Sequence, residues 1–229
     1  MKKQATKIKI CGLTEEKEAD YLNQIHADFA GMVVFFPKSK RNISLDQAKK
    51  IKAELLPEIK TVAVTVSPTL AQISQIAEAG FDLIQIHGEP ADLDIKTAKS
   101  ICEYTNKLSL PILKAFNVSD IDSYNCWQSC PSVAGFVFDA AKPGSGKTFD
   151  WTLLKNLPRS KKLFMLAGGL MPENVSNAIC FLHPDGVDVS SGVEFIEKDR
   201  PGKDPYRIQA FAEAVQLADK QLTSKHLSI

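Results

Sequence analysis

A thiol and a carboxyl group end two short apolar stretches of this sequence. Cys11 ends the stretch Lys7–Cys11, and Asp139 follows the apolar stretch 135–138. A carboxyl group beside apolar walls can serve as a general acid, because burial raises its pKa. A thiol with a cation nearby can serve as a general base, because the cation stabilises the thiolate. Together the two side chains suggest acid–base catalysis.

Each of these side chains also has an ordinary structural interpretation. A lone cysteine is often a small buried apolar residue, and a carboxyl group at the end of a strand can cap a helix or form an ion pair. Lys9 shares a strand face with Cys11, because side chains alternate along a strand. Lys114 ends another apolar stretch and is a second candidate cation, if its side chain points inward.

Two glycine-rich turns follow the last two apolar stretches. Glycines let backbone N–H groups approach an oxyanion closely, and serine hydroxyls add donors. The loops after the seventh and eighth strands of a β/α barrel are a common phosphate site. Ordinary turns also use glycine, but two such loops favour phosphate. The predicted phosphate-binding residues are Gly168, Gly169, Ser190, Ser191 and Gly192.

Three further features lie after apolar stretches. Arg41 could bind a carboxylate through its planar guanidinium, or it could be a solvated surface charge. His87 follows Gln85 on one strand face and could be a core, a hydrogen-bonding or a catalytic histidine. The segment 143–148 lacks the first glycine of a Walker A loop, so we interpret it as a mobile loop after the sixth strand.

Apolar stretches alternate with amphipathic helical patterns along the whole chain. This alternation indicates a parallel sheet covered by helices. Eight β–α units in 229 residues predict a single-domain (β/α)8 TIM barrel over residues 1–229, with residues 1–6 and 223–229 as frayed termini. A doubly wound open sheet is the alternative. The predicted strands are Lys7–Cys11, 32–35, 61–66, 83–86, 112–115, 135–138, Leu163–Leu166 and Gly186–Val189.

Local signals mark where several helices begin and end. Ser44 and Gln47 form a capping-box pattern that predicts a helix over 45–56, stopped by Pro57. Proline favours the first turn of a helix, and serine or threonine favours the position before it. The other expected starts are at Thr14, Pro68, Ser119 (helix 120–130), Pro172 and Pro205 (helix 205–222).

Composition excludes several classes of partner. The formal charge is +1, from 28 basic and 27 acidic residues, which provides no electrostatic basis for binding nucleic acid or an anionic membrane. No apolar run approaches the roughly 20 residues that span a bilayer. The five cysteines are scattered and odd in number, so we expect no disulfide framework and a reducing cytoplasm. Cys126 and Cys130 lack a nearby histidine, and we expect no metal.

The motifs resemble those of the phosphoribosylanthranilate isomerase family. They occur in the right order from residue 7 to about residue 207. They are 9–14, 35–41, 85–88, Asp139 with 144–151, 167–170 with 172–175, and 188–194. The resemblance implies an Amadori rearrangement in tryptophan biosynthesis, without a cofactor, that turns an aminoaldose phosphate into an aminoketose phosphate.

The resemblance also implies roles for individual residues. Asp139 would protonate the furanose ring oxygen, and Cys11 as thiolate would remove the C2 proton. Arg41 would hold the anthranilate carboxylate, Asp188 would contact sugar hydroxyls, and His87 would contact the substrate. The glycine-rich turns would hold the phosphate.

Other functions fit the same elements. One alternative is another phosphosugar isomerase or a Schiff-base aldolase on a TIM barrel. The aldolase would use Lys114 and would leave Cys11 without a role. A catalytically silent barrel that binds a sugar phosphate would make Cys11 or Asp139 dispensable. The partner expected in all cases is a small phosphosugar, and the chain is expected to be a monomer or a homodimer.

Overall fold

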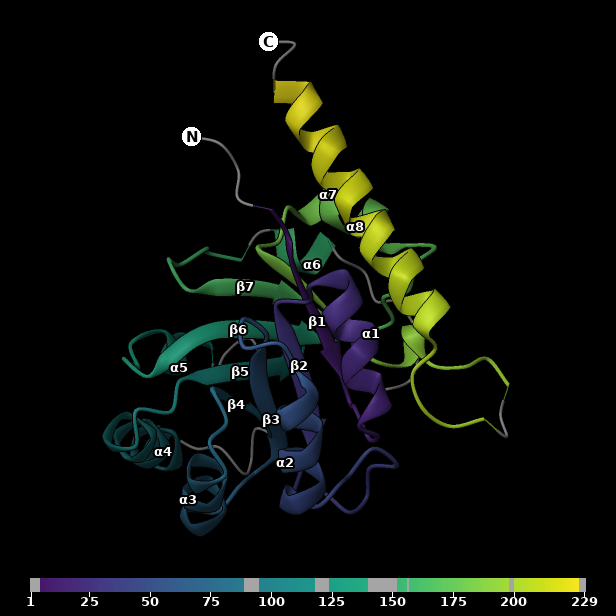
Figure 1. Ribbon diagram of the computed structural model, residues 1–229. Coiled ribbons are helices and arrows are strands. Elements are labelled where there is room, and N and C mark those ends of the chain that lie inside the picture. The colour runs from purple at the N-terminus through teal and green to yellow at the C-terminus, as the bar shows by residue number, and fades with distance from the viewer. Residues whose placement is uncertain are drawn as a thin grey trace.

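The chain folds into a closed barrel of eight parallel strands, each paired with its sequence neighbours and β8 paired with β1 (Figure 1). The computed structural model describes residues 5–88, 95–117, 124–139, 152–155, 157–197 and 200–226. The strands are β1 (Lys7–Cys11), β2 (Phe29–Val33), β3 (Lys60–Val66), β4 (Leu83–His87), β5 (Ile112–Asn117), β6 (Val133–Asp139), β7 (Leu163–Leu166) and β8 (Gly186–Val189).

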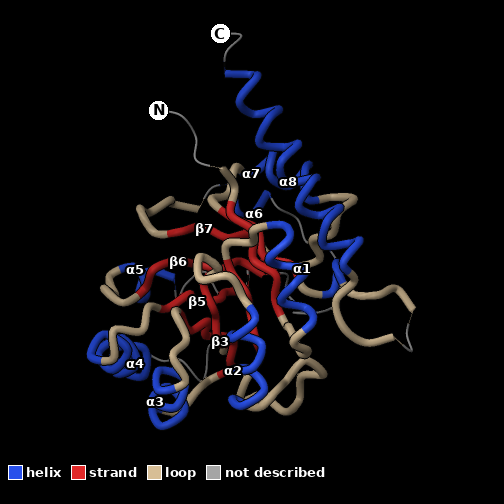
Figure 2. The backbone as a smooth tube through the Cα atoms, viewed as in Figure 1, coloured by secondary structure: helices blue, strands red, loops and turns tan. Residues whose placement is uncertain are grey.

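Helices surround the barrel, so that the strands form the centre of the molecule (Figure 2). They are α1 (Lys17–Ile25), α2 (Leu45–Glu54), α3 (Leu70–Glu78), α4 (Ile95–Lys107), α5 (Tyr124–Gln128), α6 (Thr152–Lys155), α7 (Val175–Leu182) and α8 (Pro205–His226), with a short 3-10 helix, η3 (Ser191–Val193), after β8. The TIM barrel predicted from the alternation is therefore confirmed.

No helix among the described residues is long and apolar enough to cross a membrane.

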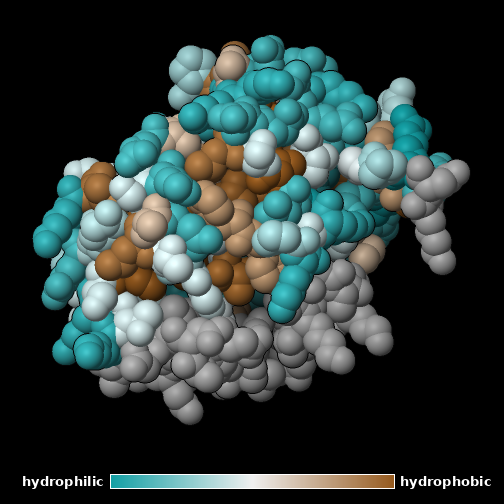
Figure 3. All heavy atoms as spheres, turned by 90° about the horizontal axis from the view of Figure 1, so that it is seen from below, coloured by the Kyte–Doolittle hydropathy of each residue, from teal (hydrophilic) through white to brown (hydrophobic). Residues whose placement is uncertain are grey.

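Two apolar clusters hold the fold together. Val62, Leu113 and Met165 belong to the cluster inside the barrel, and Ile10, Ile84 and Phe136 belong to the larger cluster between strands and helices. Alternation along each strand produces this division. Seen from below, apolar residues form a group in the middle of the visible face, with hydrophilic residues above it and to its right (Figure 3).

The prediction for the second strand was wrong in position. We expected it over 32–35, after Gly31, but β2 starts at Phe29 and has Gly31 inside it. The strand needs a glycine there, because a Cβ at Gly31 would lie 3.1 Å from the Cys11 sulfur and 3.2 Å from Lys9 Nζ. Glycine inside a strand often marks such a close approach.

Several helix ends also differ from the prediction. Ser44 does cap α2 by accepting a hydrogen bond from the Gln47 backbone, but the helix ends at Glu54. Thr69 caps α3, so Pro68 lies before the cap rather than in the first turn. Helix α1 begins at Lys17 without a side-chain cap, and Glu18 accepts a hydrogen bond from the Thr14 backbone. Helix α7 begins three residues after Pro172. The predicted cap Ser119 and the segment 143–148 lie outside the described residues.

The described parts of both termini are more ordered than predicted. Thr6 is buried, and its backbone N–H and hydroxyl each donate to Asp219 at 2.7 Å. Helix α8 continues to His226 rather than ending near residue 222, and in Figure 1 it rises beyond the start of β1. A buried chain end that is tied by hydrogen bonds resists fraying.

The scattered cysteines indicated no disulfide framework, but the structure contains one disulfide. Cys102 on α4 is bonded to Cys130, which lies between α5 and β6, across 28 residues of sequence. Spacing along the chain could not indicate this pair, because the fold alone brings α4 beside the start of β6. Cys11 and Cys180 are free.

Candidate active site

A cavity of about 480 Å³ opens at the carboxyl ends of the strands. In a barrel of this kind, side chains from several strand ends meet at this face. Nine of the ten predicted site residues line the cavity: Cys11, Arg41, His87, Asp139, Gly168, Gly169, Asp188, Ser190 and Ser191. The structure therefore brings both candidate catalytic residues and both glycine-rich turns together in one space.

Gly192 is the predicted residue that does not line this cavity. It borders a smaller cavity of about 190 Å³, together with Gly169, Leu170 and Ser191. A Cβ at Gly192 would collide with the carbonyl group of Leu170. The glycine is needed for close packing between the loops that follow β7 and β8.

A buried ion pair forms the floor of the cavity below Cys11. Lys9 on β1 is fully buried, and its Nζ donates to Asp188 Oδ2 on β8 at 2.9 Å. The two residues pair in register across the strands, so both side chains point inward. The attraction of Asp188 and of Cys11 raises the pKa of Lys9 in spite of burial. Lys9 is therefore the cation beside the thiol, as the strand alternation predicted.

The pKa of the Cys11 thiol is nevertheless raised. Desolvation inside the barrel is the largest cause, and the charge of Asp188 adds to it. The positive charges of Lys9 and Lys203 act in the opposite direction without cancelling the effect of burial. The cations stabilise the thiolate as the sequence indicated, but burial outweighs them.

This raised pKa predicts a strong pH dependence of Cys11 reactivity. Below its pKa the thiolate fraction rises about tenfold per pH unit, so alkylation by iodoacetamide should keep accelerating above the ordinary thiol value of 9.0. Peptide mass spectrometry across a pH series reads Cys11 alone, and Cys180 provides the internal comparison. A rate that reaches its plateau below about pH 8 would contradict the assignment.

His87 and Gln85 form a hydrogen-bonded pair on the inner face of β4. Gln85 Nε2 and His87 Nε2 are 2.7 Å apart. Burial, and to a smaller extent the charges of Lys114 and Lys9, lowers the pKa of His87 to about 3. The imidazole is therefore neutral at physiological pH and can contact a substrate as a hydrogen-bonding group.

The turn after β7 has the backbone that an anion site needs. Gly168 and Gly169 have φ values of 85° and 65°, a region that favours glycine. The amide of Asn174 donates to the Gly169 carbonyl at 2.9 Å and holds the turn in place. In the turn after β8, the Ser190 hydroxyl already donates to the Cys11 carbonyl at 2.8 Å. A phosphate here would rely on backbone N–H groups.

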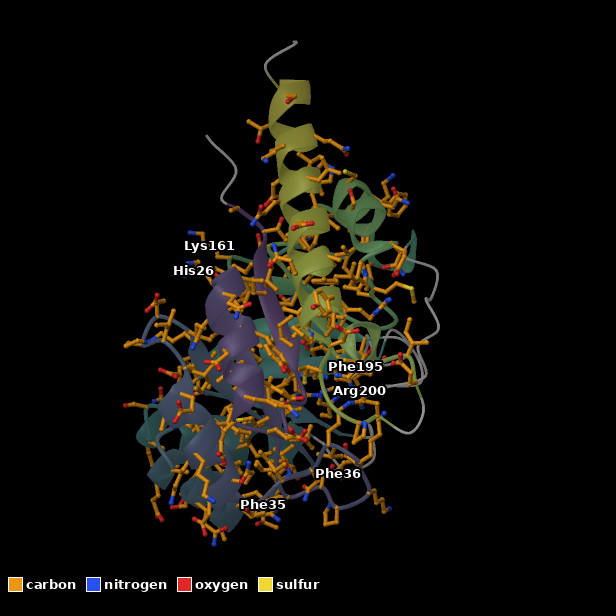
Figure 4. The ribbon with its side chains drawn as sticks, turned by 45° about the vertical axis from the view of Figure 1, so that its right-hand side comes forward. His26, Phe35, Phe36, Lys161, Phe195 and Arg200 are labelled. Carbon is orange, nitrogen blue, oxygen red and sulfur yellow. A yellow bond between two sulfur atoms is a disulfide. The ribbon has the colours of Figure 1, made fainter. Side chains whose placement is uncertain are left out.

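Arg41 is part of the cavity wall rather than a solvated surface charge. Its side chain is 16% exposed, and its Nε donates to Glu194 at 2.5 Å. Figure 4 shows that the loop after β2, with Phe36, and the loop after β8, with Phe195, lie at the same end of the barrel. The long loop after β2 therefore brings the Arg41 cation into the wall of the cavity, beside the loop after β8.

Lys114 points away from the cavity. Its neighbours Leu113 and Ala115 belong to the inner cluster, whereas the Lys114 ammonium lies over the rings of Phe116 and Trp127. It cannot support the Cys11 thiolate or form a Schiff base with a ligand in the barrel. The second cation near the thiol is Lys203, which we did not predict.

One known protein family matches most of this chain. Residues 8–214 match the model of N-(5'-phosphoribosyl)anthranilate (PRA) isomerase. The chain belongs to the PRA isomerase family. The PRA isomerase of Moorella thermoacetica is 36% identical over 93% of this chain and 91% of its own length.

Two solved PRA isomerase structures have the same barrel. The enzyme of Thermotoga maritima has a TM-score of 0.76 and 34% identity, over 92% of this chain and 98% of its own. A PRA isomerase in complex with reduced 1-(o-carboxyphenylamino)-1-deoxyribulose 5-phosphate has a TM-score of 0.73 and 32% identity, over the same shares of the two chains.

Sequence reasoning missed two residues beside this candidate site, Lys203 and Glu194. Lys203 is 1% exposed although it follows a glycine in a polar loop, and nothing in its surroundings along the chain indicates burial. Glu194 lies within one of the family motifs, but its position in the sequence does not indicate a role. The structure joins them through an isolated antiparallel bridge.

Proposed function

We propose that this chain converts N-(5'-phosphoribosyl)anthranilate into 1-(2-carboxyphenylamino)-1-deoxyribulose 5-phosphate. The observation that carries the proposal is one cavity, in a member of the PRA isomerase family, lined by a thiol, a carboxyl group and two glycine-rich turns. Such a rearrangement moves protons within one molecule and has no net redox change, so acidic and basic side chains supply the chemistry it needs.

In the proposed mechanism Asp139 donates a proton to the ring oxygen of the sugar. The C1–O bond breaks, and the nitrogen lone pair forms a C1=N Schiff base. The Cys11 thiolate then removes the proton from C2, and the electron pair moves into a C1=C2 enamine while the Schiff-base nitrogen becomes neutral. Protonation of C1 and loss of the hydroxyl proton at O2 complete the aminoketose. Burial raises the pKa of the Cys11 thiol, and the charges of Lys9 and Lys203 act in the opposite direction by stabilising the thiolate that this step needs.

The remaining groups would bind the substrate. Asp188, already paired with Lys9, has Oδ1 without a hydrogen-bond partner among the described residues, so it can accept from a sugar hydroxyl. His87 would contact the substrate as a neutral ring. Arg41 would hold the anthranilate carboxylate, and the turns after β7 and β8 would hold the phosphate.

The proposal is tested by the product formed in H2O and in D2O from freshly made N-(5'-phosphoribosyl)anthranilate. We expect a product of unchanged mass in H2O and one carbon-bound deuterium at C1 in D2O, read by mass spectrometry and NMR. Cleavage of the sugar, or a substrate adduct on lysine after borohydride, would instead support an aldolase. Binding of the reduced product analogue without turnover would support a silent binding barrel.

The cytoplasmic location and the monomeric or homodimeric state stay predictions. A structure of monomers made from the dimeric enzyme of Thermotoga maritima shows that both states occur in a relative. Size-exclusion chromatography with light scattering decides between them for this chain.

A further inference from the structure

Glu194 lies at the centre of a cluster of three cations beside the cavity. Its Oε1 accepts from Arg41 Nε at 2.5 Å and lies 3.3 Å from Lys203 Nζ, and its Oε2 lies 2.8 Å from Lys40 Nζ. Although burial acts in the opposite direction, the Arg41 hydrogen bond and the charge of Lys203 lower the pKa of Glu194 to about 2. The carboxylate is therefore charged at any working pH.

Lys203 fixes Glu194 to the rest of the site. Its side chain is 1% exposed, and its Nζ donates to the Ser190 carbonyl at 3.1 Å. Its backbone N–H donates to Glu18 on α1 at 2.6 Å. Ser190 in turn donates to the Cys11 carbonyl. The Lys203 ammonium thus links the loop after β8 to the strand end that carries the thiol.

The two ends of the segment 194–203 are paired with each other. The two residues pair as an antiparallel bridge, and the Phe195 N–H donates to the Gly202 carbonyl. Figure 4 shows Arg200 beside Phe195, and its guanidinium carbon is 3.6 Å from the centre of the ring. These contacts hold the backbone that carries the Glu194 carboxylate in a defined position.

The stem of Arg41 is held from its other side by Gly12. Gly12 has a φ of 82°, and a Cβ there would collide with Arg41 Cδ. Arg41 therefore packs on the backbone next to Cys11 while Glu194 holds its Nε. The edge that carries the two Nη groups can then donate to a carboxylate through two parallel hydrogen bonds.

We propose that Glu194, held by Lys203, is a positioning residue that orients Arg41 to select substrates with a carboxylate on the aromatic ring. This inference rests on the proposed function, which gives Arg41 its ligand. A fixed guanidinium loses less conformational entropy on binding than a mobile one. Fixing Arg41 therefore increases its affinity for the carboxylate. Removing the Glu194 carboxylate that holds Arg41 should therefore raise KM and leave the rates of the proton transfers largely unchanged.

A double-mutant cycle on binding tests this inference. Calorimetry would measure the dissociation constants of two ligands, the reduced product analogue and the same analogue without its carboxylate. Each ligand would be measured with wild type, Glu194→Gln, Arg41→Gln and the double variant. We expect Glu194→Gln to weaken binding of the carboxylate-bearing analogue roughly tenfold, and binding of the analogue without a carboxylate less than about twofold. The double variant should bind like Arg41→Gln alone, because residues that act as one unit are not additive.

Two further variants keep the test decisive. Glu173→Gln breaks a surface pair with Arg207 of 3.2 Å and should change neither affinity, which provides a matched control. Lys203→Met should reproduce Glu194→Gln if it folds, and Glu194→Gln itself keeps the shape of the side chain. Equal losses for both analogues, or additive losses in the double variant, would overturn the inference. Failure of turnover in wild type with the binding cycle intact would overturn the proposed function instead.

Discussion

Replacing Cys11 by alanine is expected to lower kcat for the isomerisation by roughly two to four orders of magnitude, with little change in KM. The variant loses the group that removes the C2 proton but keeps the phosphate turns and Arg41. The space left is small, because the thiol is a short side chain beside Gly31. Steady-state fluorescence of the anthranilate ring measures both constants.

Cys180→Ala is the matched control for this experiment. Cys180 is a second free cysteine, and it lies on α7 outside the cavity lining. Its replacement should leave kcat within about twofold of wild type. Wild-type turnover by Cys11→Ala would contradict the role of the thiol while leaving the family assignment intact.

Replacing Asp139 by asparagine is expected to cost a similar two to four orders of magnitude in kcat. Asparagine keeps the size of the side chain at the end of β6 but cannot donate an acidic proton to the ring oxygen. The ring would then open only by slow uncatalysed protonation. Stopped-flow fluorescence with enzyme in excess measures this step directly.

The control for Asp139 is the same substitution at an exposed position. Asp46 on α2 has a side chain that is 90% exposed, so Asp46→Asn should leave turnover unchanged. If Asp139→Asn retained kcat within about threefold of wild type, the general acid would have to be another group.

Much of the barrel could be predicted because strand and helix patterns are local. Strands β1, β7 and β8 have the predicted bounds, and the polar residues at strand ends meet in one cavity. The second strand was misplaced because glycine was interpreted as a turn. Only the packed structure shows that Gly31 makes room for Lys9 and Cys11.

The electrostatics of the site could not be predicted from the sequence. The thiol pKa depends on how far desolvation exceeds the effect of Lys9, and that balance is a property of the folded barrel. Lys203 is an ordinary surface lysine by its neighbours in sequence, yet the loop returns it to the barrel beside Ser190. The Cys102–Cys130 bond likewise depends on tertiary contact.

The most direct test of the central claim is the loss of ring fluorescence from freshly made N-(5'-phosphoribosyl)anthranilate, followed with wild type and with the Cys11→Ala/Asp139→Asn double variant. We predict rapid loss of signal with wild type and loss at the protein-free rate with the double variant. A rate of fluorescence loss with wild type that is no faster than the protein-free rate would contradict the proposed isomerase activity. A double variant that kept more than about a tenth of wild-type kcat would contradict the acid–base pair.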